Sequence, residues 1–114
     1  MLTNHTVSLD LSLRMREAGW KQEGSLFYWH KHKRTNKWIV SAISLSHYQY
    51  ADKVAAISAG ELMERIPMKE IYILKDKNEL FFCRWDRTMY AAEDKSLPNA
   101  LAKLWLHMKA EKII

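Results

Sequence analysis

The C-terminal segment SLPNALAKLWLHMKAEK most constrains how this chain of 114 residues folds, because its apolar residues fall on one side of a helix. Ser96 is a capping residue, and Pro98 occupies the first turn, where its missing N–H is harmless. The apolar stripe consists of Leu97, Ala100, Leu101, Leu104, Trp105 and Met108. A chain this short needs that surface buried, so the segment predicts a long closing helix packed on the rest of the fold.

Two shorter helices are expected before it. The first covers about 9–18: its apolar residues alternate as in a strand, but Ser8 is a natural N-cap and the following residues favour helix. The second lies in SAGELMERIP, where Ser58 and Glu61 form a capping box and Pro67 is expected to end the helix.

Five segments favour strands. Two aromatic and β-branched runs, near 25–32 and 37–45, flank the polar stretch KRTN and predict a β-hairpin. EIYILKD and ELFFCRWD predict a second hairpin with a tight turn at Lys77-Asn78, and RTMYAAE is a weaker third strand. The intervening SHYQYADKVAAI is interpreted as a loop, with a short helical piece as the alternative.

Consecutive strands with short links pair antiparallel. The prediction is an α+β fold in the order α-β-β-α-β-β-β-α, with an antiparallel meander sheet of about five strands. The long C-terminal helix packs across one face of this sheet, and two shorter helices complete the fold. A composition of 48% hydrophobic and 27% charged residues favours one globular domain, residues 1–114.

No apolar run approaches the length of a membrane span, and the N-terminus lacks the basic start and apolar core of a signal peptide. The single cysteine, Cys83, cannot form an internal disulfide and is expected to be a small buried hydrophobe. We therefore expect a cytoplasmic protein with no membrane partner and no cofactor.

The stretch FYWHKHKRTNKWIV concentrates the basic character of the chain. The net charge is +5, and four positive charges fall close together: Lys31, Lys33, Arg34 and Lys37. These cations can contact phosphates, while Tyr28, Trp29 or Trp38 can stack on bases. The four cations with Trp29 and Trp38 are our candidate nucleic-acid-binding residues. The alternative is a solvated turn whose lysines protect an edge strand from aggregation.

Metal binding and catalysis have weaker signals. His30 and His32 would point to one face of a strand and could share a metal, but no third ligand has a fixed place near them. The sequence has no Gly-flanked serine, no phosphate-cradling glycine loop and no histidine–glutamate helix motif. We therefore expect no metal site and no enzyme, with an active site assembled from scattered residues as the alternative.

Three blocks, in this order, resemble a family of small, uncharacterised bacteriophage and prophage proteins: LRMREAGWKQEGSLFYW, SAGELMERIP and LPNALAKLWLHMK. The most specific block is the string ALAKLWL in the closing helix. The resemblance implies an α+β fold, an origin in a mobile element and a bacterial host. It implies no activity, and no site residue can be carried over from it.

The leading functional hypothesis is a small non-enzymatic accessory protein of phage type that acts by protein–protein interaction. Its partner would be an unidentified protein, or a second copy bound through an exposed sheet edge. The alternative hypothesis is nucleic-acid binding through the basic hairpin tip, residues 31–37. An exposed basic patch favours the second hypothesis, and a long uncovered strand or a large apolar patch favours the first.

Overall fold

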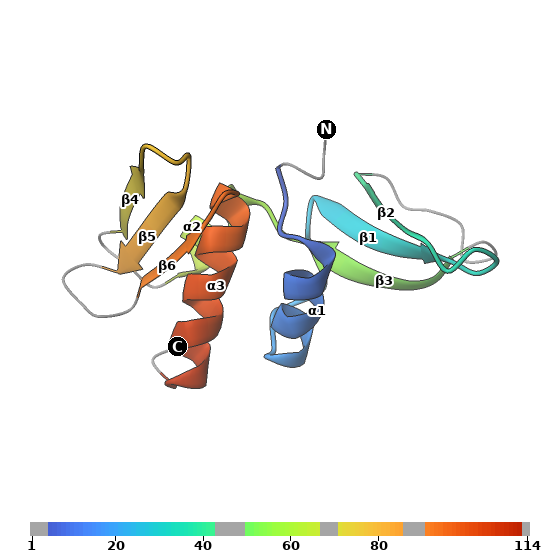
Figure 1. Cartoon of the computed structure of the whole chain (residues 1–114). Coiled ribbons are helices and arrows are strands. Elements are labelled where there is room, and N and C mark those ends of the chain that lie inside the picture. The colour runs from blue at the N-terminus through green and yellow to red at the C-terminus, as the bar shows by residue number, and fades with distance from the viewer. Residues whose placement is uncertain (1–4, 43–49, 67–70, 86–90, 113–114) are drawn as a thin grey trace.

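The computed structural model describes residues 5–42, 50–66, 71–85 and 91–112, which form helices and two small antiparallel sheets (Figure 1). In chain order the elements are α1 (Leu9–Glu17), β1 (Phe27–His32), β2 (Trp38–Ser41), β3 (Tyr50–Ala56), α2 (Ala59–Arg65), β4 (Ile71–Lys75), β5 (Phe81–Trp85), β6 (Ala91–Asp94) and α3 (Leu97–Ala110). One sheet has the strand order β2-β1-β3 and the other β4-β5-β6. No helix in these ranges is long and apolar enough to cross a membrane.

The helices lie between the two sheets (Figure 1). α1 packs on β3, α3 packs on β5 and β6, and both α1 and α2 contact α3. The molecule is elongated, with extents of 48 × 32 × 18 Å. The turn between β1 and β2 consequently lies at one far end, away from the helices (Figure 1).

The α+β class is confirmed, but the single five-stranded meander is wrong. The described residues form two three-stranded sheets, in the order α-β-β-β-α-β-β-β-α. The additional strand, β3, lies in the segment that we interpreted as a loop. Val54 and Ala56 belong to a small apolar cluster with Trp29, against which α1 packs through Leu9 and Leu13. Ala55 belongs to the main core, the larger cluster of buried residues that includes Leu62, Leu104 and Met108. Because both faces of β3 are covered there, the strand lacks the apolar–polar alternation that marks a half-exposed strand.

The predicted helix starts are confirmed. Ser8 accepts a hydrogen bond from the Leu11 amide, and Ser96 accepts one from the Asn99 amide. Ser58 and Glu61 form the reciprocal capping box. α2 ends at Arg65, and Pro67 lies outside the described residues.

The strands lie where the sequence predicts them, but they are shorter than predicted. Of the segment 37–45, residues 38–41 form β2, and residues 43–45 lie outside the described ranges. β6 covers the end of RTMYAAE, whose first four residues are likewise not described. The β4–β5 turn is one residue longer than expected: the Asp76 amide donates to Leu80 O, and Glu79 takes a φ of +60°.

The closing helix supplies much of the main core, as its apolar stripe predicts. Leu101, Leu104 and Met108 have no exposed surface. The rings of Trp105 and Trp20 pack edge to face, with 5.2 Å between their centres. Cys83 is buried on β5, and burial raises the pKa of its thiol to about 11. The thiol therefore stays protonated at neutral pH and serves as a packed apolar group.

Candidate nucleic-acid interface

The basic segment forms the turn of the β1–β2 hairpin. β1 pairs with β2 as far as Lys31 opposite Trp38, and with β3 as far as His32 opposite Tyr50. The three-stranded sheet therefore supports the hairpin up to the base of the turn. We call residues 33–37, which extend beyond this support, the tip loop.

The tip loop has a defined hydrogen-bonded shape. The His32 amide donates to Lys37 O at 2.8 Å, and the Asn36 amide donates to His32 O at 2.9 Å. Asn36 takes the left-handed conformation, with a φ of +56°, which asparagine tolerates better than most residues. Within the loop, the Lys37 amide donates to the Thr35 hydroxyl oxygen at 3.3 Å, and His32 Nδ1 accepts the amides of Arg34 and Thr35.

Three of the four candidate cations are exposed in this loop: Lys33, Arg34 and Lys37. Lys31 is half-buried on β1, where its cross-strand neighbour on β3 is Asp52. The Asp52 carboxylate lies 3.3 Å from the guanidinium of Arg16 on α1. Asp52, the acidic residue opposite Lys31, is thus engaged with α1.

Trp29 does not belong to an exposed stacking surface, contrary to our expectation. Its side chain is only 9% exposed and packs with Val54 and Ala56. The indole Nε1 donates a hydrogen bond to Val7 O at 3.2 Å. Trp38 is half-buried and packs against the same cluster. These two residues anchor the hairpin to the fold, because their rings are part of its packing.

Tyr28 is held in a similar way on the other face of the sheet. Its hydroxyl donates to Gln22 O at 2.8 Å and accepts the Ser25 amide at 3.3 Å. The Lys53 ammonium lies 4.6 Å from the centre of the Tyr28 ring. Lys53 is exposed on β3 opposite His30, and it adds a further cation to this sheet.

The two candidate metal ligands have different environments. His30 is 4% exposed, and its burial, with the nearby charge of Lys53, lowers the pKa of its imidazole below 6.5. The β1–β3 register shifts between Lys31 and His32, and His32 Nδ1 accepts loop amides. Within the described ranges, no three His, Cys, Asp or Glu side chains gather as metal ligands.

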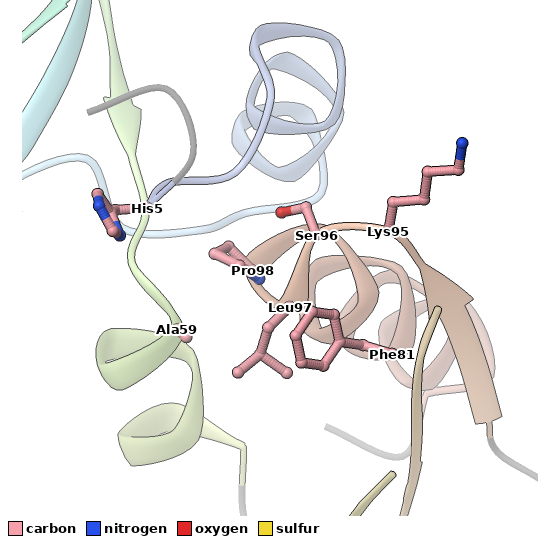
Figure 2. Close-up of a pocket in the computed structure, with 7 residues that line it drawn as sticks. All are labelled: His5, Ala59, Phe81, Lys95, Ser96, Leu97 and Pro98. Carbon is pink, nitrogen blue, oxygen red and sulfur yellow. The ribbon is translucent and has the colours of Figure 1, made fainter. Parts of the chain in front are cut away.

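A separate pocket of about 260 Å³ lies at the N-terminal ends of α2 and α3 (Figure 2). It is lined by His5, Ala59, Phe81, Lys95, Ser96, Leu97 and Pro98. The Ser96 hydroxyl oxygen accepts the Asn99 amide, so this polar atom serves as the cap of α3. The Lys95 side chain points away from the apolar residues (Figure 2). The pocket is therefore mainly an apolar hollow.

A second surface is the outer face of the β4-β5-β6 sheet. Ile73 and Cys83 point toward the main core, so Leu74 and its cross-strand neighbour Phe82 point to the opposite side. Leu74 is 64% exposed and Phe82 is half-buried. This face combines apolar side chains with Glu93, the neighbour of Phe82 on β6.

Comparison with known proteins adds no assignment. No family model matches the chain, and no curated protein or solved structure matches it. The resemblance to phage proteins therefore stays a prediction from the sequence, and the functional argument depends on the geometry of the chain itself.

Two features of the interface were missed from the sequence. Lys53 could not be assigned to the hairpin sheet while its segment was interpreted as a loop. His32 was considered only as a metal ligand. A polar side chain next to a turn commonly bonds to backbone groups within a few residues, and this is the signal that could have identified its role.

Proposed function

We propose that this chain is a non-enzymatic nucleic-acid-binding protein that contacts the phosphate backbone with its tip loop. The observation that carries the proposal is the exposure of Lys33, Arg34 and Lys37 on a loop with a fixed backbone. Lysine and arginine side chains bind phosphates and release condensed counterions, which is the main source of sequence-independent affinity. A loop of fixed shape has less conformational freedom to lose on binding than a flexible tail.

The geometry favours contact with phosphates over recognition of bases. A free two-stranded ribbon can enter a major groove, but this hairpin carries a third strand as far as His32. Only the five residues 33–37 extend beyond it. The indole of Trp29 is engaged in the core. We therefore expect weak, salt-dependent binding to duplex DNA with little sequence preference.

The test is a fluorescence titration of duplex DNA at three salt concentrations. With the three exposed cations of the tip loop, at ~0.9 unit for each phosphate neutralised, log Kd should vary with log salt with a slope magnitude of about 2.7. An increase from about 50 to 200 mM salt should then weaken binding roughly fortyfold. Replacing Lys33 and Arg34 with glutamine should reduce the slope by about 1.8 units.

The matched control replaces Lys77 and Lys95 with glutamine. Both residues are exposed and lie outside the hairpin sheet. Each double variant removes two positive charges, so the net charge changes equally in the two. We expect this control to retain most of the wild-type slope. Equal losses in the two double variants would reduce the effect to overall charge, and no binding of the wild type at low salt would refute the proposal.

A second candidate function is protein–protein interaction, and the exposure of Leu74 on the outer face of the β4-β5-β6 sheet favours it. Exposed apolar surface of this kind is used for partner binding when it is continuous. In this case the chain would be the phage-type accessory protein of the leading hypothesis from the sequence, in a bacterial cytoplasm. Light scattering of the purified protein with and without Leu74→Glu tests self-association. A monomer in both cases would exclude a second copy as the partner.

A further inference from the structure

His32 occupies a special place at the base of the tip loop. Its Nδ1 accepts the Arg34 amide at 3.2 Å and the Thr35 amide at 3.4 Å. Its backbone is fixed in the same region, because the His32 amide donates to Lys37 and the His32 carbonyl accepts from Asn36. One residue therefore contacts the loop backbone at four positions.

The side-chain contacts constrain both the loop and the imidazole. A neutral imidazole accepts at one nitrogen and donates at the other, so acceptance at Nδ1 places the proton on Nε2. The two amides that converge on Nδ1 come from consecutive residues, and their direction sets where the Arg34 and Thr35 side chains leave the backbone. Among the three exposed cations of the loop, Arg34 is the one whose own amide is held in this way.

We propose that His32 is a positioning residue, which acts through its Nδ1 to hold the tip loop in the conformation that presents Lys33, Arg34 and Lys37 to a phosphate backbone. This inference rests on the proposed nucleic-acid function. His32 need not touch the nucleic acid, and it contributes by reducing the conformational freedom that the loop loses on binding.

Three substitutions separate this role from general packing. His32→Asn keeps an acceptor near the position of Nδ1, because the asparagine side chain ends at that point. His32→Gln reaches instead toward the position of Nε2, and His32→Ala removes the acceptor. If Nδ1 holds the loop, only the asparagine variant should behave like the wild type.

The first measurement does not depend on nucleic acid. Solvent exchange of the Arg34 and Thr35 amides, followed by NMR, should accelerate roughly three- to tenfold in His32→Ala and His32→Gln, the range expected for loss of one neutral hydrogen bond. His32→Asn should remain near the wild-type rate. Unchanged exchange in all three variants would overturn the role of Nδ1, whether or not the protein binds DNA.

The second measurement is the duplex titration at low salt. We expect Kd to rise roughly three- to tenfold in His32→Ala and His32→Gln, with the salt slope unchanged because the three loop cations remain. His32→Asn should restore the affinity. Equal or tighter binding by His32→Ala would overturn the inference, since the freed amides would then serve the ligand better than the held loop. If the wild type does not bind duplex, the proposed function fails, while the exchange rates still report on the loop.

Discussion

Replacement of Trp29 by phenylalanine separates a structural role of this side chain from a role in base stacking. The smaller ring loses the hydrogen bond from Nε1 to Val7 O, and it leaves space in the cluster with Val54 and Ala56. The Val7 carbonyl also accepts the Ser12 hydroxyl at 3.3 Å, so it keeps one partner. The hydrogen bond should therefore cost only about 1 kcal/mol, and the lost contacts about 1–2 kcal/mol.

A total near 2 kcal/mol is measurable in a domain of this size. Unfolding entropy of about 2.1 cal/mol/K per residue gives roughly 240 cal/mol/K for the 114-residue chain, so Trp29→Phe should lower the midpoint of thermal unfolding by about 8 °C. Circular dichroism with temperature measures this midpoint, and Trp38→Phe, at a half-buried position, should lower it less. An unchanged midpoint together with weaker binding to single-stranded DNA would refute the packing argument and return Trp29 to the interface.

Three other substitutions test the fold. Leu104→Ala should lower the free energy of unfolding by about 2–5 kcal/mol in urea denaturation, because Leu104 is fully buried, and a loss below ~1 kcal/mol would contradict the packing of α3. Glu79→Gly should raise it by about 0.5–1 kcal/mol, since glycine adopts the +60° φ without the strain of a side chain, and a destabilised variant would contradict this turn. Burial and Lys53 lower the pKa of His30 from 6.5, so the unfolded chain binds this proton first as the pH falls. Stability from His30 is therefore fully present above about pH 6.5 and is lost below it, with a slope of up to ~1.4 kcal/mol per pH unit, which His30→Phe should reduce in acid unfolding curves.

The parts of the fold that the sequence predicts well are those with local signals. The capping box of Ser58 and Glu61 needs only residues three apart, and the stripe of α3 is visible within fourteen residues. For α1, the cap at Ser8 and the helix-forming residues predict the helix correctly, whereas the alternating apolar pattern favours a strand. These signals depend on the backbone nearby and not on distant partners.

Sheet organisation is different, because it depends on contacts between distant segments. The apolar residues of β3 do not alternate with polar ones, because Val54 and Ala55 are buried on opposite faces. Val54 lies under α1, and Ala55 lies against the main core. The strands form two sheets with helices between them: α1 packs on β3 of one sheet, and α3 packs on β5 and β6 of the other. No local pattern in the strand segments encodes that separation.

The candidate site shows the same difference between features set by neighbouring residues and features set by distant contacts. The charge of Lys33, Arg34 and Lys37 and the left-handed tendency of Asn36 are properties of the turn sequence, and both could be predicted. The role of Trp29 could not, since an aromatic residue beside a basic cluster has the same sequence pattern whether it faces solvent or the core. Its indole meets Val7, twenty-two residues earlier in the chain, and only the folded arrangement shows that this contact removes it from the binding surface. For a basic hairpin of this kind, the cations can be assigned from sequence, whereas each aromatic residue needs its burial known before it is assigned to stacking.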